Sequence, residues 1–523
     1  MASNSHTSFF KLEISQPRSW QEWIFGVWGN VALVVLAGLL GALLYPPHEV
    51  WWVGWFALCP LLIALRRTRR WAASGWLMLL FGLVFFAVTL PWIRQIFGAS
   101  ALGVYLLMAL PMVPFGIIYR VLGDRQTAWA TVLLAVLLWV ALDWVRCEGW
   151  YFQFSWAQLG LAFVACGKRG VLYSNLGVYG ATMLLVLANA VGSEILLRKQ
   201  TWRARSTHLV TFALLVFALS LYINKPVGCR LLPGGEIQRA VYINPPTVAL
   251  VQSEMGSFAG LCARTRALKP AHPSVVVWPE YAITDYPLSQ PDLLRKLFAL
   301  AREMDATLVL GCKRHLPVTT ECDWLRRRGM MLEGGELYGN IALVIDPHGK
   351  LLGTYQKTHP IQFFADGVPG TRFPTFDTPV ARLGVAICYD FDFADTARQL
   401  TQHGAQLLVV PTFDPENWGA LQHWQHARIA QARAAEVGRW VVRATSSGVS
   451  QIIAPDGTNA VTMTSGLLVT ATGVVIPSDE MTVYVRYTHY LPQVALILVL
   501  LWVVGAGFIQ WHGKRCQNLD SLD

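Results

Sequence analysis

The sequence predicts a polytopic α-helical membrane protein of about eight spans that carries one inserted α/β domain. Of its 523 residues, 54% are hydrophobic and only 14% are charged, which is too apolar a composition for an ordinary soluble protein. The apolar residues form long blocks before residue 224 and after residue 490. Between these positions, apolar runs of strand length alternate with helical patterns, which is typical of a layered α/β fold.

Eight apolar segments make up the predicted membrane part. A spanning helix needs about 20 predominantly apolar residues, and the second and seventh segments are shorter than this. A polar lead of 23 residues precedes the first span and no small-residue cleavage site closes it, so we do not expect a cleaved signal peptide. The candidate spans are Ile24–Tyr45, Trp51–Leu65, Trp71–Ile93, Ala101–Tyr119, Ala128–Trp144, Leu176–Leu197, Leu209–Ile223 and Leu491–Trp511.

Basic residues in the short loops predict the orientation of these spans. If the amino terminus is cytoplasmic, most loop Lys and Arg residues lie on the cytoplasmic side, including the run RRTRR at 66–70. Such a bias places the amino terminus inside the cell and the domain between the last two spans outside. The run RRTRR can also be interpreted as a binding patch for lipid headgroups, although its position favours a topology signal. The net charge of +10 is then mostly a topology signal, and it does not indicate nucleic-acid binding, because the basic residues are not gathered on one domain.

The outer domain is expected to be an α/β sandwich. Its apolar runs are continuous, as in strands that are covered on both faces, and helical stretches such as 291–304 and 421–437 separate several of them. The expected strands are 247–252, 274–280, 306–311, 340–346, 383–388, 406–411, 439–445 and 448–455. The expected parts of the chain are a cytoplasmic lead 1–23, a seven-span domain 24–223, the outer domain 224–490, a last transmembrane helix 491–511 and a cytoplasmic tail 512–523.

Three predicted strand ends in this domain carry reactive side chains. Glu280 closes VVVWPE, Lys357 follows GTYQ and Cys388 closes LGVAIC. Functional sites of α/β sheets form at strand ends. There a carboxylate can take the proton of a thiol, and a lysine with the N–H of Tyr389 can stabilise an oxyanion. A single buried cysteine usually acts only as a small apolar residue, but three such ends are hard to explain by packing.

The motifs around these residues resemble those of a known superfamily. WPE, YQKTHP and ICYD, in this order, resemble the Glu–Lys–Cys triad of the nitrilase, or carbon-nitrogen hydrolase, superfamily, whose members form a thioester with substrate. Four longer segments resemble the apolipoprotein N-acyltransferase family. They are YPPHEVWWVGWFALCPLLIALRR, GWLMLLFGLVFFAVTLPWI, VLLWVALDWVRCEGWYFQFSWAQLG and RATSSGVSQIIAPDG. The resemblance implies a multi-pass protein of the bacterial inner membrane with a periplasmic nitrilase-like domain of α-β-β-α layers before the last span.

The resemblance also implies a reaction. Cys388 would attack the sn-1 ester of a phospholipid, typically phosphatidylethanolamine, and release a lysophospholipid. The amino group of a diacylglyceryl-cysteine at the start of an apolipoprotein would then take the acyl chain. Glu280 would act as base and acid, Lys357 as oxyanion donor, and Tyr389 would lend its backbone N–H. The family uses no cofactor, and no metal is expected.

The sequence departs from the family pattern at two positions. Ala365 stands where the family has a glutamate, but Asp366 falls there when the count runs back from the next Val-Pro. Either Asp366 replaces that glutamate through a shift of the loop, aided by Gly367, or it starts a solvent-exposed turn. After the cysteine and tyrosine, the family usually has glutamate, and here Asp390 is shorter.

Other reactive residues have simpler explanations. His423 and His426 lie three residues apart on a predicted helix, but no third ligand has a recognisable spacing, so a structural pair is expected rather than a metal site. Cys312 and Cys322 either form a disulfide or stay free thiols. Two other functions are compatible with parts of the sequence: a membrane-anchored amidase that hydrolyses its thioester, and a non-catalytic receptor or transporter with a nitrilase-like fold. The intact triad argues against an inert fold, and the lack of repeated charges in mid-span argues against transport.

Overall fold

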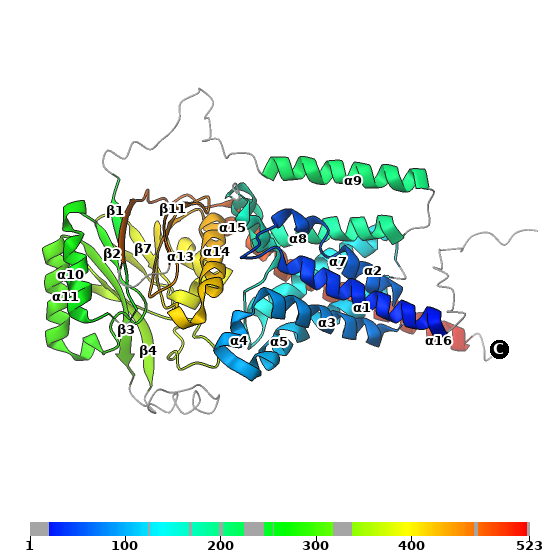
Figure 1. The fold of residues 1–523 in the computed structure, drawn as a ribbon, viewed down its shortest axis with the longest axis horizontal. Coiled ribbons are helices and arrows are strands. Elements are labelled where there is room, and N and C mark those ends of the chain that lie inside the picture. Colours follow the sequence, from blue (N-terminus) through cyan, green and yellow to red (C-terminus); the bar gives the residue numbers. More distant parts are fainter. Residues whose placement is uncertain are drawn as a thin grey trace, which may run out of the picture.

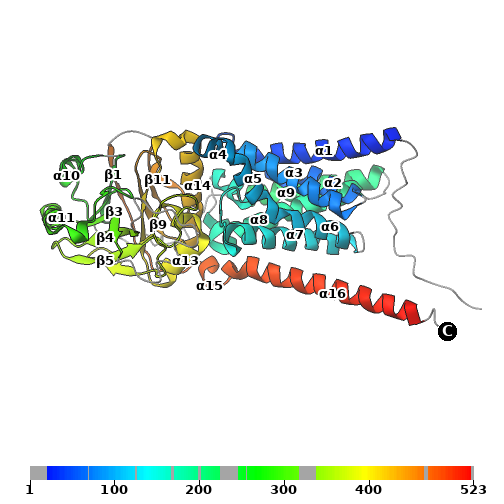
Figure 2. The same cartoon turned by 90° about the horizontal axis from the view of Figure 1, so that it is seen from below.

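A layered α/β body and a bundle of apolar helices lie end to end in the computed structural model (Figures 1 and 2). The structure describes residues 20–68, 70–123, 126–166, 170–197, 202–223, 245–254, 256–316, 337–464 and 469–519. Most of the predicted cytoplasmic lead and the end of the predicted tail lie outside these ranges, and so does Cys322. Cys312 is buried as a free thiol on a strand of the α/β body.

The helices of the bundle run along the long axis of the molecule (Figure 2). Five segments are long and apolar enough to cross a membrane, counted over the described residues: Trp71–Thr89, Trp92–Gly123, Ala128–Gly149, Gly170–Leu197 and Thr488–Trp511. The predicted total of eight spans stays a prediction. The main bundle helices are α1 (Trp20–Ala42), α2 (Cys59–Arg67), α3 (Trp71–Thr89), α4 (Trp92–Phe97), α5 (Ala101–Ala109), α6 (Val113–Gly123), α7 (Ala128–Trp144), α8 (Gly170–Leu197), α9 (Trp202–Ile223) and α16 (Leu491–Leu519).

The second predicted span is not one long helix. It consists of a 3₁₀ helix, Trp51–Trp55, and of α2, whose 9 residues extend only about 14 Å. That length is about half of the hydrocarbon thickness of a bilayer. The side chain of Asn189 on α8 makes this break possible, because its Oδ1 accepts hydrogen bonds from Leu58 N–H at 2.7 Å and Cys59 N–H at 3.0 Å at the start of α2.

Two six-stranded sheets form the centre of the α/β body. Their strand orders are β12-β1-β2-β3-β4-β5 and β11-β10-β9-β8-β7-β6. In each sheet the three strands β1–β3 or β7–β9 are parallel, and the remaining pairs are antiparallel. The strands are β1 (Thr247–Gln252), β2 (Val275–Val277), β3 (Thr307–His315), β4 (Tyr338–Ile345), β5 (Leu351–Gln356), β6 (Thr375–Asp377), β7 (Arg382–Val385), β8 (Leu407–Thr412), β9 (Trp440–Thr445), β10 (Ser450–Ile453), β11 (Asn459–Met463) and β12 (Val469–Val474).

Helices cover the outer face of each sheet. α10 (Phe258–Ala267) and α11 (Pro291–Met304) lie outside the first sheet, and α13 (Ala394–Gln402) and α14 (Ala420–Val437) lie between the second sheet and the bundle (Figure 1). β1 shows why its inner residues 248–251 are all apolar: Val248 and Leu250 belong to the core between the sheets, whereas Ala249 and Val251 pack under α10 and α11. The predicted α-β-β-α sandwich is confirmed.

The two bodies meet at α14 and α8. Gly177 has a φ of 66° and interrupts α8, so the next peptide N–H has no carbonyl one turn before it. Glu436 on α14 replaces that partner, because its Oε1 accepts a hydrogen bond from Val178 N–H at 2.7 Å. A carboxylate at a helix start also interacts favourably with the helix dipole. This contact fixes the α/β body on the bundle.

Candidate active site

The three predicted triad residues come together between the two sheets. Glu280 lies three residues beyond the end of β2, and Lys357 directly follows β5. Cys388 lies three residues beyond the end of β7, in the other sheet. All three side chains are buried, with exposed fractions of 2%, 0% and 2%. Buried ionisable groups are almost always paired with one another. Here Lys357 is paired with Glu280, and the charges of both act on the Cys388 thiol.

Hydrogen bonds fix both carboxylate oxygens of Glu280. Oε1 lies 2.8 Å from Lys357 Nζ and accepts a bond from Asn340 Nδ2 at 2.6 Å. Oε2 accepts the backbone N–H of Phe413 at 2.9 Å. The carbonyl oxygen of Phe413 lies 3.7 Å from Cys388 Sγ, so the carboxylate and the thiol contact the same residue. The Glu280 charge also acts on the thiol, so a proton acceptor is available near the nucleophile, as nucleophilic catalysis requires.

The charges of the site shift the pKa values of its members. Burial raises the pKa of the Cys388 thiol well above its ordinary value; the Glu280 charge raises it further and the Lys357 charge lowers it. Burial also raises the pKa of Glu280, against the lowering effect of Lys357. For Lys357 burial acts downward, yet Asp366 and Glu280 raise its pKa well above the usual value. The lysine is therefore a permanent cation, and a thiolate at Cys388 depends on it.

Cys388 begins a tight 3₁₀ turn, Cys388–Asp392, with a φ of 49°. This left-handed conformation costs a non-glycine residue on the order of 1–2 kcal/mol. Asp390 stabilises the turn, because its carboxylate accepts the N–H groups of Ile387 at 3.1 Å, Thr358 at 2.9 Å and His359 at 2.6 Å. Burial acts to raise the pKa of Asp390, but the hydrogen bonds and charge of His359 lower it overall. The shorter aspartate thus connects the nucleophile turn to the segment after Lys357.

Asp366 lies inside the site. Its side chain is 6% exposed, and its Oδ2 lies 2.8 Å from Lys357 Nζ. Its Oδ1 accepts hydrogen bonds from Tyr281 Oη at 2.8 Å and Asn340 Nδ2 at 2.9 Å. Gly367 follows with a φ of 83°, a left-handed conformation that favours glycine. The alternative of a solvent-exposed turn is therefore wrong, whereas the catalytic role of Asp366 stays a prediction.

Tyr389 contacts the helix bundle. Its hydroxyl donates a hydrogen bond to the carbonyl of Gln153 at 2.9 Å, in the loop after α7. The guanidinium of Arg146, buried in the π-helical turn Val145–Gly149 that follows α7, donates to the carbonyls of Phe154 and Trp156, both at 2.9 Å, in the same loop. The bundle therefore supplies one wall of the site. The role of the Tyr389 N–H as an oxyanion donor stays a prediction.

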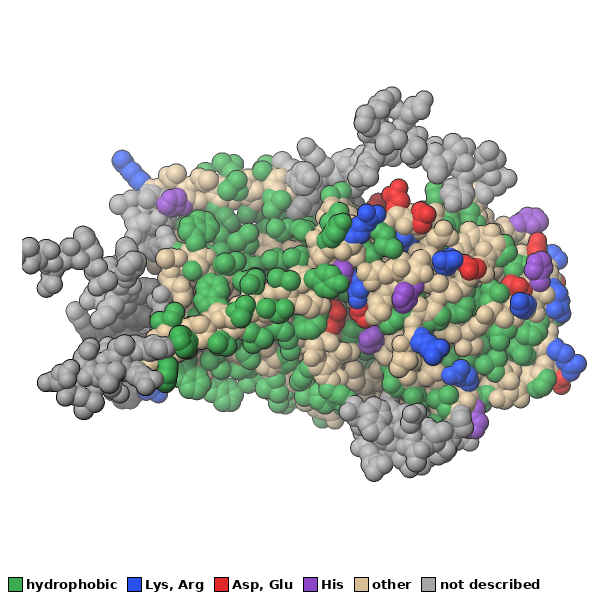
Figure 3. Space-filling view, turned by 180° about the vertical axis from the view of Figure 1, so that it is seen from behind, with side chains coloured by type: hydrophobic (Ala, Val, Ile, Leu, Met, Phe, Trp, Pro, Cys, Tyr) green, Lys and Arg blue, Asp and Glu red, His purple; other side chains and the backbone are tan. Residues whose placement is uncertain are grey.

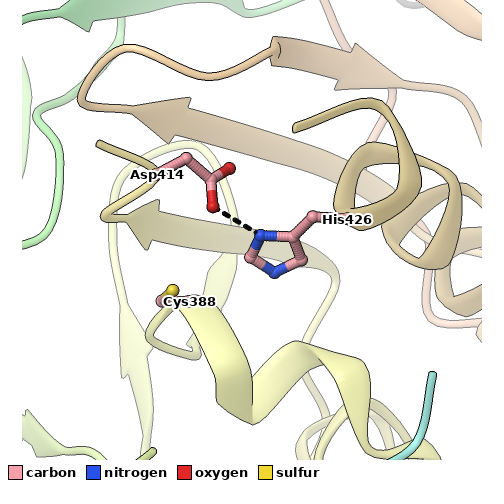
Figure 4. A group of neighbouring side chains, drawn as sticks. All are labelled: Cys388, Asp414 and His426. Carbon is pink, nitrogen blue, oxygen red and sulfur yellow. Dashed lines mark hydrogen bonds and ion pairs between the residues drawn. The ribbon is translucent and has the colours of Figure 1, made fainter. Parts of the chain in front are cut away.

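Two predicted helix residues have separate partners. His423 Nε2 lies 3.0 Å from the carbonyl of Pro415, whereas His426 faces two carboxylates, so they do not form a pair. Possible third ligands do exist: donor atoms of Cys388, Asp414 and His426 all lie within 4.8 Å of one another (Figure 4). Because both ring nitrogens of His426 already face carboxylates, the group is arranged as an ion-pair network.

Sequence reasoning missed Asn340, Phe413 and this network. Asn340 had a detectable signal, since it is the amide side chain of the buried strand YGNIALVI, and buried polar groups need partners. Phe413 acts through its backbone, which no residue type reveals. Asp414 and His426 come from different elements, and only the fold brings them to Cys388.

Two cavities of different character meet at the triad. One, of about 630 Å³, extends from the bundle to Cys388, and the other, of about 1380 Å³, reaches Glu280. Phe364 lines both. The first is almost wholly apolar, and its wall includes Trp92, Ile93, Ile96, Phe97, Val104, Phe154, Trp156, Tyr389 and Trp418. The second is lined partly by polar residues, among them Tyr281, Thr284, Lys313, Tyr338 and Ser446. The thiol is thus reached from the side of the bundle.

Comparison with known proteins gives the family. The family model of the apolipoprotein N-acyltransferase N-terminal domain matches residues 37–191, and that of carbon-nitrogen hydrolase matches residues 251–471. Apolipoprotein N-acyltransferase of Geobacter metallireducens is 25% identical over 464 residues, which cover 80% of this chain and 84% of the relative. The enzyme of the same name from Azotobacter vinelandii is 26% identical over 514 residues, 91% of this chain and 95% of the relative.

Among solved structures, an amidase of Nesterenkonia sp. AN1 aligns with 46% of this chain and 96% of its own, at 22% identity and a TM-score of 0.35. The first family model matches residues of the helix bundle, and the second matches residues of the α/β body. Both parts of the chain are also covered by the match to the Azotobacter relative, which extends over 91% of the chain. The chain belongs to the apolipoprotein N-acyltransferase family.

Proposed function

We propose that this protein is an acyltransferase that N-acylates the amino-terminal diacylglyceryl-cysteine of apolipoproteins, with a membrane phospholipid as acyl donor. The apolar cavity that extends from the helix bundle to Cys388 carries this proposal. A long acyl chain that enters from a membrane needs an apolar path to the nucleophile, because each CH₂ group gains about 0.8 kcal/mol on leaving water. A site for small soluble amides has no need of such a path.

The first half-reaction forms a thioester. Glu280 takes the proton of the Cys388 thiol, and the sulfur attacks the carbonyl carbon of the donor ester. Lys357 and the N–H of Tyr389 stabilise the oxyanion. The carbon–oxygen bond to glycerol then breaks, and Glu280 returns the proton to the leaving alkoxide. A lysophospholipid leaves and the acyl chain stays on Cys388. Phosphatidylethanolamine is the expected donor.

The second half-reaction transfers the chain to the acceptor. The free amino group of the apolipoprotein attacks the thioester carbonyl, and Glu280 takes a proton from the attacking nitrogen. The carbon–sulfur bond breaks, and the thiolate of Cys388 recovers the proton. Two easier steps replace one difficult exchange. In both steps, Asp366 and Glu280 hold the Lys357 ammonium in place from two sides, at 2.8 Å each. No cofactor takes part.

The proposed location is the bacterial inner membrane, with the α/β domain 224–490 in the periplasm. On the face that Figure 3 shows, hydrophobic side chains cover most of the described part of the bundle, whereas charged side chains gather on the α/β body. This distribution supports a bundle within the bilayer and a body in water. The charge bias of the loops supports the orientation, with seven spans in 24–223, the eighth in 491–511 and both termini in the cytoplasm.

Depletion of this protein in its own cells tests the function. Mass spectrometry of lipoprotein amino termini is expected to find diacylated forms accumulating in place of triacylated ones. Unchanged triacylation contradicts the proposal. An amidase that shares the triad but releases its acyl group to water, or a non-catalytic receptor or transporter, leaves the lipoprotein termini unchanged on depletion.

A further inference from the structure

His426 is a buried histidine placed between two carboxylates beside the nucleophile. It lies on α14, its side chain is 4% exposed, and its ring lines the apolar cavity that reaches Cys388. Nδ1 lies 2.7 Å from Asp414 Oδ1, and Nε2 lies 3.1 Å from Asp392 Oδ1 (Figure 4 shows the first contact). The ring also packs on Trp156, with centroids 5.5 Å apart. The mechanism above does not use this residue.

One carboxylate belongs to the turn that carries Cys388, and the other belongs to the segment that binds Glu280. Asp392 ends the 3₁₀ turn that Cys388 begins. Asp414 follows Phe413, whose N–H binds Glu280 and whose carbonyl faces the Cys388 sulfur. A ring that binds both carboxylates therefore connects the nucleophile turn to the segment that orients the base.

The same contact reaches the helix bundle. Trp156, in the loop after α7, donates its indole N–H to Asp392 Oδ2 at 2.6 Å. Ser155 donates its hydroxyl to the Asp392 carbonyl at 2.9 Å. His426 thus binds an aspartate that Ser155 and Trp156 of the bundle also bind. The Asp392 contacts therefore link His426 to the boundary between the two bodies.

The charges of this cluster balance only if the ring is protonated. Asp414 Oδ2 is paired with Arg443 Nη2 at 2.6 Å, which leaves Asp392 without a cation other than His426 among the described residues. Burial acts to lower the pKa of His426 and so does Arg443, whose Nη2 lies 2.9 Å from Nδ1, but Asp392 and Asp414 raise it to about 9. The other ionisable groups near the ring are Cys388 and, one turn before it on α14, His423.

We infer that His426 is a positioning residue whose imidazolium fixes the nucleophile turn against the Phe413–Asp414 segment and stabilises the thiolate of Cys388. Neutralising it leaves the buried charge of Asp392 without a cation among the described residues and removes one of the two cations paired with Asp414, whose charge raises the pKa of the Cys388 thiol. A negative charge there disfavours a second one on Cys388 and raises the pKa of the thiol. The inference rests on the proposed role of Cys388, but its test measures the thiol itself.

The experiment is alkylation of Cys388 by iodoacetamide in the purified full-length protein, followed by peptide mass spectrometry over a range of pH. The His426→Gln variant keeps a hydrogen-bonding side chain without the charge. We expect alkylation at pH 7 to slow about tenfold, since a rise of one pKa unit leaves one tenth of the thiolate. His423→Gln, a buried histidine of the same helix whose Nε2 faces a backbone carbonyl, is expected to match the wild type.

His426→Lys provides a second and independent measurement, because it keeps a cation at this place. Alkylation within about threefold of the wild-type rate is expected for it. A pH profile of His426→Gln equal to that of the wild type overturns the inference, and so does a tenfold loss in a His426→Lys protein that elutes normally. If the wild-type protein has a reactive Cys388 thiol but transfers no acyl chain to a lipopeptide, the proposed function is contradicted instead. The two failures can therefore be told apart.

Discussion

Asp366 Oδ2 and Lys357 Nζ form a buried ion pair at 2.8 Å, although the loop that carries Asp366 departs from the family pattern. Lys357 thereby has a carboxylate on each side, since Glu280 Oε1 lies at 2.8 Å as well. A lysine between two carboxylates keeps its proton and its position. One of the two carboxylates, Glu280, is then free to exchange a proton in the proposed reaction without releasing the cation.

We expect Asp366→Asn to lower the rate of acyl transfer by tenfold or more, about 1.4 kcal/mol in the barrier. The amide keeps the shape but loses the charge that holds Lys357. Transfer from a phospholipid to a diacylated lipopeptide measures it. Asp377→Asn is the control, because Asp377 pairs with Arg382 on the surface with an 80% exposed side chain. Wild-type activity of Asp366→Asn would show that Glu280 alone positions the lysine.

Cys388→Ala is expected to abolish the acyl-enzyme and to leave the protein folded. Alanine keeps the Cβ atom, so the strain at φ 49° is unchanged and only the sulfur is lost. Mass spectrometry of the intact protein after incubation with phospholipid detects the thioester. Cys262→Ala, which removes a buried thiol from α10, is the control and should still be acylated.

Single replacements of Glu280 and Lys357 should also stop the first half-reaction. Their losses are not expected to add to that of Cys388→Ala, because the three residues act as a unit. An acyl-thioester of normal yield in Cys388→Ala excludes this cysteine as the nucleophile.

The inner strands could be predicted from the sequence and the outer strands could not. Each of the eight expected strands overlaps an observed one, whereas β6, β11 and β12 were missed and β5 was expected only as the short stretch GTYQ before Lys357. These four are the edge strands of the two sheets. An edge strand is covered less fully, so its residues are mixed in polarity, as the alternately exposed β11 shows, and they give no continuous apolar run.

The candidate site divides in the same way. Glu280, Lys357 and Cys388 were predicted because each follows a recognisable strand. The contacts that hold them were not, since Asn340 lies 60 residues from Glu280 and 26 from Asp366 in the chain. The break in the second predicted span depends likewise on Asn189, about 130 residues away. Such pairings follow from the fold, and no local pattern encodes them.

The pH dependence of stability should report the charge on His426. Its pKa is about 9 in the folded protein and about 6.5 in an unfolded chain. The folded state therefore holds this proton more tightly, and the stabilisation is fully present below pH 6.5. It decreases between about pH 6.5 and 9, by at most about 1.4 kcal/mol per pH unit, and is absent above that range.

Thermal unfolding of the purified protein between pH 6 and 10 measures this effect. The difference in midpoint between wild type and His426→Gln is expected to shrink as the pH rises, while other titrating groups cancel in the comparison. A difference that stays constant over this range shows that the ring is neutral throughout.

Reporter fusions test the topology. A fusion after Ile223 is expected to be periplasmic and one after Arg515 cytoplasmic, because the charge bias places the amino terminus inside. The test also decides on the second predicted span, since a membrane part with an even number of crossings before residue 224 would put the α/β body in the cytoplasm. Labelling of an engineered cysteine in 224–490 only from the cytoplasmic side contradicts the proposed substrates.

Filling the apolar cavity should separate chain binding from chemistry. Ile96, on α4, lines the cavity that reaches Cys388, and Phe363 and Phe364 line the same cavity. Ile96→Trp adds a large ring to a space of about 630 Å³ and leaves the triad untouched. The acyl-enzyme should form at least tenfold more slowly from a long-chain phospholipid, because the chain loses part of its apolar path. Reaction with a short soluble acyl ester should remain within about threefold of the wild-type rate.

Leu102→Trp is the matched control, since Leu102 lies on α5 with 67% of its surface exposed on the outside of the bundle. It adds the same volume and is expected to change neither rate. Equal losses with long and short donors in Ile96→Trp would mean that the substitution disturbs Cys388 itself. No loss with either donor would place the acyl chain elsewhere, and the polar cavity at Glu280 would then be the next path to test. A loss of rate with the long donor alone would show that the acyl chain binds in the cavity beside the helix bundle when it reacts with Cys388.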